Sequence, residues 1–310
     1  MAIFLGIDGG GSKTSCLIGD ETSILGAGTA GASNPVRVGE AQARDALAAA
    51  IRQACAIANI TPSQIKKTCV GLAGAARPEI SGPVRLCLGE LVAGEIEVVG
   101  DMVIALEAAF GGDPGVIVIA GTGSIAYGRN SKGQTARAGG WGFAISDEGS
   151  GQWVGRAAVA ATVRALDLGD AEGSNESLLR NLMKFWQVET REQLVVLANA
   201  TPPPDFSALF PLVHAAADHG DRIALDVLNQ AGAELAGLAR TVVGRLFSSI
   251  AADADKVAVA MSGGVFSAST LVRQVFYNCL RAEQPGLTIN PNVIEPVRGA
   301  LAMARKSAIR

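Results

Sequence analysis

The sequence predicts an α/β fold made of two related halves, and three observations support this prediction. Segments with the alternation of β-strands are separated by alanine-rich and amphipathic helical segments for most of the length. The strand, turn and strand pattern that opens the chain begins again at residue 115. Hydrophobic residues make up 49% of the 310 residues and charged residues 18%, which is enough for two domains or one large core.

The first element is a hairpin around the stretch GIDGGGSKT at residues 6–14. A P-loop would place lysine directly after its last glycine, whereas here Ser12 separates Gly11 from Lys13. A P-loop also leads into a helix. The residues that follow instead alternate between apolar and polar, reach a turn at 19–20 and continue into a second strand-like segment. We therefore expect a strand, a glycine turn, a strand, a short turn and a third strand.

The rest of the first half alternates between helices and buried strands. The expected elements are, in order, a loop with Asn34-Pro35, a helix over 40–58, a short helix that begins at Thr61-Pro62, a strand over 68–74, a helix over 81–93, a strand over 95–101 and a helix that follows Asp101. The prediction at Thr61-Pro62 depends on threonine as an N-cap with proline at the first helical position.

The second half begins with the same three-strand pattern, in the stretch GVIVIAGTGSIAYGRNSKGQTARAGG. Its apolar run, its turn of glycines and hydroxyls and its polar second turn repeat the architecture of the opening stretch, which indicates an internal duplication. The further expected elements are a helix over 150–166, helical segments over 174–247 with a capping box at Thr190 and Gln193, a turn at 201–205, a strand, glycine turn and helix over 256–267, and a helix from Pro296.

The composition excludes several classes of protein. The net charge is −3 and the lysines and arginines are scattered, so we expect no nucleic-acid partner. Because no run of about 18 apolar residues occurs, we expect no membrane span. The start of the chain lacks the basic residues of a signal peptide, and the five cysteines are far apart, so we expect reduced thiols and a cytoplasmic protein. His214 and His219 are five residues apart, a spacing that does not suit a zinc site on one helical face.

Two glycine turns at equivalent positions of the two halves are candidates for holding phosphate. One contains residues 9–12, GGGS, and the other contains residues 121–124, GTGS. Successive backbone N–H groups in such turns bind anions, and glycine lets the backbone approach a ligand closely. A single turn of this kind is weak evidence, but two turns in duplicated halves favour a polyphosphate ligand. A third glycine pair, Gly263-Gly264, ends a predicted strand and is a candidate contact for a base or ribose.

Three carboxylates complete the candidate site. Asp8 ends the first strand, Asp101 ends a later strand of the first half, and Asp147 lies in the stretch GGWGFAISDEGSG. Ligands of α/β proteins bind at the carboxyl ends of strands. A phosphoryl-transfer enzyme needs Mg²⁺ near the phosphates and a base for the attacking hydroxyl, and we assign these roles to Asp8 and Asp101 respectively. Asp101 is also a candidate N-cap of the helix that follows it.

These motifs together resemble the sugar kinase/heat-shock ATPase/actin superfamily, and within it the N-acetylglucosamine kinase and glucosamine kinase group. The resemblance covers nearly the whole chain. The opening motif fits any member of the superfamily, whereas the ordered set GTGS, GGWG and DEGS is specific. The motifs that carry the resemblance are GIDGGGSKT, GASNP, VVGDMVIAL, IAGTGSIAYG, GGWGFAISDEGSGQW and MSGGV.

The resemblance implies a duplicated ribonuclease H-like fold, which is the actin-like ATPase fold, with two lobes around an ATP and sugar cleft. The first lobe is expected over 1–114 and the second over 115–295, and the C-terminal helix over 296–310 is expected to pack on the first lobe. The implied activity is ATP-dependent phosphorylation of an amino sugar, N-acetylglucosamine or glucosamine, at its 6-hydroxyl, with Mg²⁺ as the metal. The implied partner is therefore a small-molecule amino sugar, and a homodimer is compatible with the resemblance.

The resemblance also assigns roles to individual residues. Asp101 is the catalytic base and also contacts the sugar, and Asp8 assists the metal. The residues implied for ATP are Gly10, Gly11, Ser12, Lys13, Gly121, Thr122, Gly123, Ala217, Gly263 and Gly264. The residues implied for the sugar are Asn34, Asp101, Gly140, Trp141, Gly142 and Asp147. Strand alternation turns the Lys13 side chain toward solvent or an ion pair, so its contact with phosphate is not required.

Two residues of the GGWG and DEGS stretch have alternative interpretations. Trp141 is either a stacking platform for the sugar or a core tryptophan whose backbone alone lies near the ligand. Glu148 is either a second sugar ligand or a cap for the helix that begins near Ser150, and we favour the cap.

Two other functions fit parts of the same motif set. Activator ATPases of 2-hydroxyacyl-CoA dehydratase systems share the glycine turns, but they hold an iron–sulfur cluster between subunits, which requires closely placed cysteines. No cysteine occurs between Gly123 and Cys279 in this sequence. A non-catalytic sugar sensor would be expected to lack the base or the phosphate-binding hydroxyls, whereas Asp101, Ser12 and Thr122 are all present.

Overall fold

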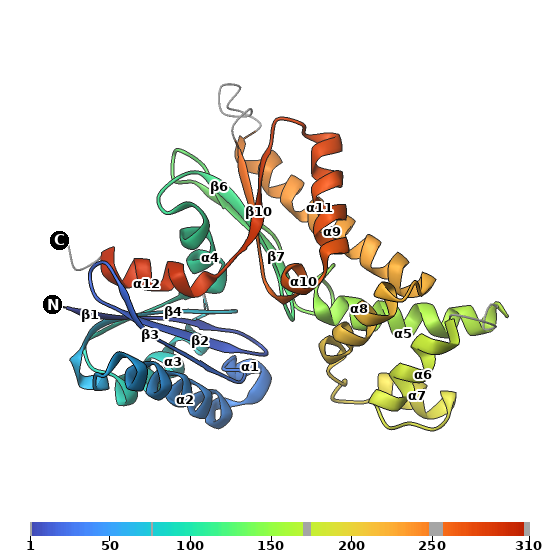
Figure 1. Ribbon diagram of the computed structural model, residues 1–310, viewed down its shortest axis with the longest axis horizontal. Helices are drawn as coiled ribbons and strands as arrows, with labels where there is room; N and C mark the ends of the chain where they lie inside the picture. Colours follow the sequence, from blue (N-terminus) through green and yellow to red (C-terminus); the bar gives the residue numbers. More distant parts are fainter. Residues whose placement is uncertain (1, 76, 170–174, 248–256, 307–310) are drawn as a thin grey trace. The chain divides into compact units, whose positions relative to one another are not determined.

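The computed structural model describes residues 2–75, 77–169, 175–247 and 257–306 (Figure 1). The chain divides into two compact units. The first unit consists of Met1–Ile117, Tyr127–Thr135 and Ile294–Arg310, and the second consists of Val118–Ala126 and Ala136–Val293. Each unit is described separately below.

The first unit contains a five-stranded sheet. Its strands are β1 (Ile3–Gly9), β2 (Thr14–Gly19), β3 (Ile24–Ala30), β4 (Ile65–Leu72) and β5 (Glu95–Gly100), in the order β3-β2-β1-β4-β5. Strands β1, β2 and β3 form antiparallel pairs, while β4 is parallel to β1 and β5 is parallel to β4. The glycine turn lies between β1 and β2, as the alternation of the sequence predicted.

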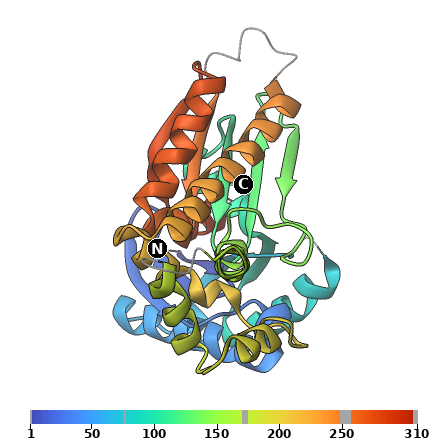
Figure 2. The same ribbon diagram turned by 90° about the vertical axis from the view of Figure 1, so that its right-hand side faces the viewer.

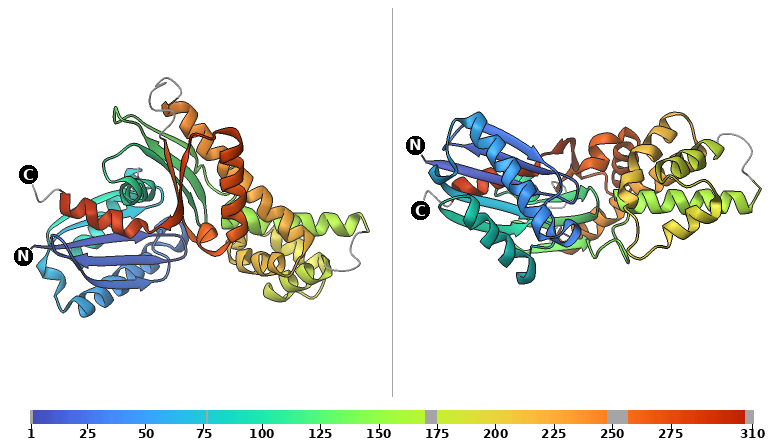
Figure 3. Two further views of the ribbon diagram at one scale, coloured as in Figure 1. Left: turned by 45° about the horizontal axis from the view of Figure 1, so that its top comes forward. Right: turned by 90° about the horizontal axis from the view of Figure 1, so that it is seen from below.

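Helices cover both faces of this sheet, which explains why β1 carries no polar side chain from Ile3 to Ile7. Leu5 and Ile7 point to the face covered by α2 (Glu40–Ala58) and α3 (Pro78–Leu91). Phe4 points to the opposite face, where α4 (Asp101–Phe110) and α12 (Pro296–Lys306) pack. Figure 3 shows α2 and α12 on opposite sides of the sheet.

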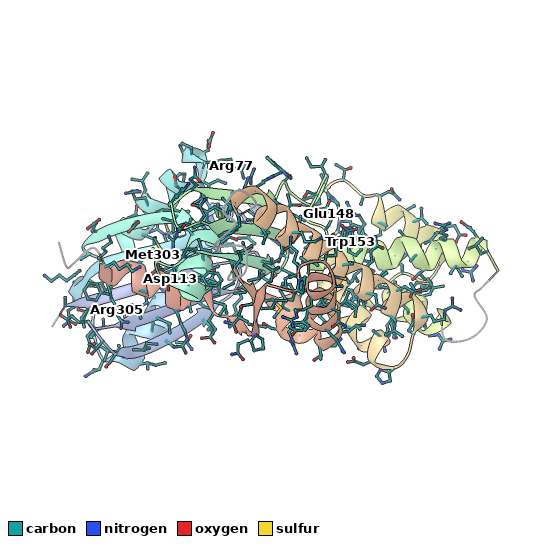
Figure 4. The ribbon with its side chains drawn as sticks, turned by 90° about the horizontal axis from the view of Figure 1, so that it is seen from above. Arg77, Asp113, Glu148, Trp153, Met303 and Arg305 are labelled. Atoms are coloured by element: carbon teal, nitrogen blue, oxygen red, sulfur yellow. The ribbon has the colours of Figure 1, made fainter. Side chains whose placement is uncertain are left out.

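The C-terminal helix is therefore an integral part of the first unit. Leu301 and Ala304 of α12 are buried against Phe4 and Ile104. At the end of the helix, Arg305 donates from Nε to the carbonyl of Asp20 at 2.7 Å and from Nη2 to the carbonyl of Ser23 at 2.7 Å (Figure 4). These bonds join α12 to the turn between β2 and β3.

The second sheet repeats the topology of the first. Its strands are β6 (Gly115–Ala120), β7 (Ser124–Arg129), β8 (Thr135–Gly139), β9 (Ala258–Ser262) and β10 (Thr288–Ile294), in the order β10-β9-β6-β7-β8. In each sheet the first strand is central, two hairpin strands follow on one side, and two later strands complete the other side. The repeated order confirms the predicted α/β duplication.

The second unit also carries a large set of helices (Figure 2). These are α5 (Gly151–Asp167), α6 (Asn175–Phe185), α7 (Arg191–Ala198), α8 (Phe210–Asp218), α9 (Arg222–Phe247), α10 (Gly264–Ala268) and α11 (Thr270–Glu283), with a short 3₁₀ turn, η2, over Phe206–Leu209. Helix α9 packs against α5, α8 and α11. The predicted capping box is present at Thr190 and Gln193, where α7 begins. No helix within the described ranges is long and apolar enough to cross a membrane.

Three local predictions need correction. Residues 30–39 were expected to be a loop, but they contain the one-turn helix α1 (Pro35–Val38). Strand β4 begins at Ile65 and helix α3 at Pro78, both three residues earlier than predicted. Strand β10 was not predicted, because Pro291 and its neighbouring asparagines are typical of turns. An edge strand tolerates proline since one side of its backbone makes no ladder bonds, and β10 is an edge strand.

Candidate functional site

The candidate residues divide between the two units. Those of the first unit are Asp8, Gly10, Gly11, Ser12, Lys13, Asn34 and Asp101. Those of the second unit are Gly121, Thr122, Gly123, Gly140, Trp141, Gly142, Asp147, Ala217, Gly263 and Gly264.

The glycine turn of the first unit is held by hydrogen bonds on its inner side. Gly10 donates its N–H to the carbonyl of Lys13 at 2.9 Å, and the N–H of Ser33 donates to the carbonyl of Gly10 at 3.2 Å. Below the turn, the fully buried Thr14 hydroxyl lies 2.7 Å from the hydroxyl oxygen of Ser33 and 2.7 Å from the carbonyl of Gly31. The turn and the loop that contains Asn34 are thus neighbours.

Thr14 and Ser33 are residues that sequence reasoning missed. Both are buried and polar, and together they hold the turn against the loop. A threonine at the start of a strand gives no signal of such a role, because β-branched residues are common there for packing reasons alone. Their partnership follows only from the register that places Thr14 beside Ala30 at the end of β3.

Asp8 and Asp101 form an interacting pair of carboxylates in the first unit. Burial raises the pKa of Asp8 to about 7, with a further contribution from the negative charge of Asp101, while Lys13 opposes the shift. Burial likewise raises the pKa of Asp101, against the effect of the backbone N–H of Met102. The negative charge of Asp101 close to the buried carboxylate of Asp8 makes this a place where a cation is favourable.

The pair suits Mg²⁺ chemically. Magnesium is usually held by one or two carboxylates together with waters and substrate phosphates, because it gives up its waters reluctantly. Among the described residues, no group of three or more histidine, cysteine or acidic side chains is placed to hold a metal ion. Asp8 is therefore the residue that would hold a magnesium ion that arrives with a nucleotide, with the carboxylate of Asp101 nearby.

Asp101 lies at the N-terminus of α4, directly after β5. Gly100 is the N-cap residue, so Asp101 occupies the first position of the helix, and its Oδ1 accepts from the N–H of Met102 at 3.0 Å. One carboxylate oxygen therefore stabilises the helix end. A carboxylate accepts through two oxygens, so a second ligand is compatible with this role.

Asn34 also has a helix-capping role. Its Oδ1 accepts from the N–H of Val36 at 3.1 Å at the start of α1. Its side-chain amide retains donors in addition to this acceptor. The predicted sugar contact of Asn34 would therefore be made as a donor to a hydroxyl oxygen.

The glycine turn of the second unit is joined to the start of α5 by backbone hydrogen bonds. Gly151 donates to the carbonyl of Gly121 at 2.8 Å and Gln152 donates to the carbonyl of Thr122 at 3.2 Å. The buried Ser124 donates from Oγ to the carbonyl of Glu148 at 2.7 Å. The first N–H groups of α5 are thus satisfied by the turn itself, so this helix end is not an anion site.

Asp147 connects the same turn to the glycine-rich loop before it. Its buried carboxylate accepts the backbone N–H groups of Ser124 and Gly142. Burial raises its pKa, and the charge of Arg156 opposes that shift. A Cβ on Gly123 would lie 2.9 Å from Oδ2 of Asp147, so a side chain at this position would force the carboxylate to shift away from the turn. Asp147 therefore contacts both the predicted nucleotide turn and the predicted sugar loop.

Trp141 is exposed, so its interpretation as a core tryptophan is wrong. The residue is 64% exposed, and the guanidinium of Arg137 lies over its ring at 3.9 Å from the ring centroid. The cation occupies one face of the ring. The flanking residues Gly140 and Gly142 have φ angles of 70° and 98°, a conformation that favours glycine.

The cap of α5 is Ser150, which corrects the assignment of that role to Glu148. Ser150 accepts from the N–H of Trp153 through its side chain. The carboxylate of Glu148 instead accepts from the hydroxyl of Ser146 at 3.1 Å (Figure 4). Serine is the better N-cap because its short side chain reaches back to the third N–H of the helix.

The third glycine turn lies beside the second one. Gly263 follows β9 with φ 101°, and a Cβ there would collide with the backbone of Ala120, the residue before Gly121. Gly264 begins α10. Ala217 is buried in α8, so its side chain packs within the protein. A nucleotide contact at Ala217 would have to involve its backbone.

The duplicated sheets and the paired glycine turns define the class of the protein, which is an ATPase of the actin-like fold. A candidate N-acetylglucosamine kinase from Chromobacterium violaceum has a similar structure, with a TM-score of 0.77 and 26% identity, and the match covers 98% of this chain and 99% of that one. The fold is also that of a ROK family glucokinase from Streptomyces griseus, solved with glucose and AMPPNP, at a TM-score of 0.61 and 19% identity over 98% of this chain and 100% of that one.

The chain belongs to the BadF/BadG/BcrA/BcrD ATPase family, whose model matches residues 5–304. Two curated relatives align over nearly their whole length. The N-acetylmuramic acid/N-acetylglucosamine kinase of Clostridium acetobutylicum is 30% identical over 98% of this chain and 99% of the relative. The N-acetyl-D-glucosamine kinase of Dictyostelium discoideum is 28% identical, with 98% of each protein covered.

Proposed function

We propose that this protein is a kinase that transfers the γ-phosphoryl group of ATP to the 6-hydroxyl of an N-acetylated amino sugar. The observation that carries the proposal is the Asp8 and Asp101 pair beside a glycine turn, in a chain that is similar over its full length to two sugar kinases. The pair supplies the two roles that phosphoryl transfer needs, a carboxylate for the metal and a base for the attacking hydroxyl.

The first unit would supply the chemistry. Asp101 would accept the proton of the sugar hydroxyl while that oxygen attacks the γ-phosphorus, and the bond to the bridging oxygen of ADP would break. Asp8 would hold Mg²⁺, which would supply charge neutralisation for the phosphates. The turn that contains Gly10, Gly11 and Ser12 would bind phosphate through its N–H groups and hydroxyl. The positive charge of Lys13 lowers the pKa of Asp8 and so favours the ionised, metal-binding form.

The second unit would bind the other end of the nucleotide and part of the sugar. Residues 121–123 would contact phosphate, with Gly263, Gly264 and the backbone of Ala217 toward the adenosine. Gly140, Trp141, Gly142 and Asp147 are the sugar-binding residues that we propose for the second unit, and Asn34 is one that we propose for the first unit. We place the reaction in the cytoplasm, in keeping with the five cysteines, all of which are free thiols.

The same thiols give no support to an electron-transferring activator function. Cys16, Cys55 and Cys69 are buried in the core of the first unit, and burial raises the pKa of each. Clusters are held by cysteine thiolates, and a raised pKa disfavours the thiolate form of these three residues. An iron assay on anaerobically purified protein tests this alternative directly, and bound iron would favour it.

The test of the proposed function is a coupled ADP-release assay with a panel of sugars. The panel contains N-acetylglucosamine, N-acetylmuramic acid, glucosamine and glucose. We expect turnover of at least one N-acetylated sugar, and we expect Asp101→Asn to lower kcat by roughly 100-fold or more, as for removal of a general base. Asp113→Asn is the matched control, because Asp113 is an exposed aspartate of the same unit (Figure 4). Unchanged turnover in Asp101→Asn would refute the base assignment.

A further inference from the structure

A largely apolar cavity lies in the second unit, beside the predicted sugar loop. Its volume is about 480 Å³, within the range of roughly 300–1,000 Å³ that is typical of small-molecule sites. It lies between α5, α7 and the segment that leads into η2. Val159, Leu194 and Phe206 form part of its wall, and Phe143 and Gln152 line the side that continues into the sugar loop and the start of α5.

The charge of this cavity is its most informative property. Among the described residues that line it, Arg156 is the one charged side chain, and none is acidic. Nη1 of Arg156 donates to the carbonyl of Phe143 at 2.9 Å, which fixes the side chain at the cavity. A guanidinium has five N–H donors in a planar fork that matches a carboxylate. The cavity therefore suits a ligand that has an apolar portion and one negative charge.

The cavity adjoins the residues assigned to the sugar. Phe143 directly follows Gly142, the last glycine of the GGWG loop. Arg156 acts electrostatically on the carboxylate of Asp147, which places its charge near that residue. A sugar held by this loop and Asp147 would therefore have Arg156 nearby, within the second unit.

We infer that this cavity recognises the 3-O-lactyl ether of N-acetylmuramic acid, with Arg156 pairing with its carboxylate. The inference rests on the proposed kinase function and names the substrate class of the same site. N-acetylmuramic acid differs from N-acetylglucosamine by this lactyl group, whose methine carbon carries a methyl group and a carboxylate. The methyl group matches the apolar wall and the carboxylate matches the guanidinium. The ammonium group of glucosamine has the wrong charge for this cavity.

The test compares the turnover of two sugars by the same variant. A substitution that impairs the site in general lowers both rates, so its effect cancels in their ratio. The selectivity is the kcat/KM for N-acetylmuramic acid divided by that for N-acetylglucosamine. We expect Arg156→Gln to lower this ratio by roughly 10- to 100-fold, the effect of losing a hydrogen-bonded ion pair. Arg164→Gln is the matched control, because Arg164 is an exposed arginine further along α5 that does not line the cavity, and it should leave the ratio within about twofold.

A change in the substrate provides an independent measurement. The methyl ester of N-acetylmuramic acid keeps the shape of the lactyl group but removes its charge. The wild-type protein should prefer the acid to the ester, while Arg156→Gln should not distinguish them. Such a cycle isolates the pairing of the guanidinium with the carboxylate from other effects of the substitution.

Three results would overturn the inference. An equal fall in kcat/KM for both sugars in Arg156→Gln would mean that Arg156 acts by holding the loop through Phe143. Wild-type turnover of N-acetylglucosamine without binding of N-acetylmuramic acid would reject the inference and leave the proposed function intact. If the wild-type protein phosphorylates neither sugar, the proposed function fails, and calorimetric binding of N-acetylmuramic acid decides the inference. Equal affinity of wild type and Arg156→Gln would then reject it, and weaker binding by the variant would support it.

Discussion

The substitution Asp8→Asn should make the first unit more stable at alkaline pH while it removes a residue assigned to the metal. Burial and the neighbouring Asp101 raise the pKa of Asp8 from its ordinary value of 3.8 to about 7. A carboxyl group with a raised pKa in the folded state binds its proton more tightly there than in the unfolded state. Its ionisation therefore lowers the free energy of unfolding as the pH rises from about 4 to 7. Asparagine carries no such penalty.

The size of the effect follows from the two pKa values. With pKa values of 3.8 and about 7 for the unfolded and folded states, ionisation of Asp8 lowers the stability by roughly 3 kcal/mol more at pH 8 than at pH 4.5. The increase in the free energy of unfolding that Asp8→Asn produces should differ by the same amount between these two pH values. The cost of burying the asparagine amide is the same at both, so it cancels in the comparison.

The assay must report on the first unit. The three tryptophans lie in the second unit, so their fluorescence monitors the wrong part of the chain; they are Trp141, Trp153 and Trp186. We would therefore follow urea unfolding by pulsed hydrogen exchange of the β1 and β4 amides, at pH 4.5 and 8, without nucleotide or Mg²⁺. The expected result is an increase in the urea midpoint of Asp8→Asn that is large at pH 8 and small at pH 4.5.

Asp20→Asn is a control in the same unit, for which the expected change in stability at pH 8 has the opposite sign. The carboxylate of Asp20 accepts the N–H groups of Ser23 and Thr22 at 2.7 and 2.8 Å, which lowers its pKa. Its ionised form contributes stability that is lost as the pH falls, so Asp20→Asn should reduce stability at pH 8. An equal change in midpoint at both pH values for Asp8→Asn would refute the explanation by buried charge.

Two further predictions concern packing and the second unit. Asp147→Ala removes the acceptor of the Ser124 and Gly142 N–H groups, so the KM for ATP and the KM for the sugar should both rise at least about fivefold. Steady-state kinetics measures this, and a rise in the KM for the sugar alone would contradict the link between the two loops. Leu301→Ala should lower the stability of the first unit by about 2–5 kcal/mol, because Leu301 is buried between α12 and the sheet. Urea unfolding followed through β1 measures this, and an unchanged midpoint would show that α12 contributes little to that core.

The two hairpins are examples of structure that could be predicted from residues close together in the sequence. The alternation after Gly11 and the glycine turns predicted β1, β2 and β3, and the same pattern at residue 115 predicted β6, β7 and β8. Side-chain alternation and turn chemistry depend on neighbours only a few residues apart, so one sequence shows them. Strand β10 could not be recognised in this way, because its place at the edge of the second sheet is what makes Pro291 acceptable.

The sequence by itself determined the duplicated α/β plan, the glycine turns and the candidate carboxylates, which lie at or after the ends of strands. The tertiary structure decided which of these groups interact. It places Asp101 close enough to Asp8 to raise its pKa, buries Thr14 with Ser33 below the first turn, and leaves Trp141 exposed beneath Arg137. It also brings Arg156 to a cavity beside the sugar loop. These properties depend on burial and on distances between segments far apart in the chain, and a pattern of neighbouring residues contains neither.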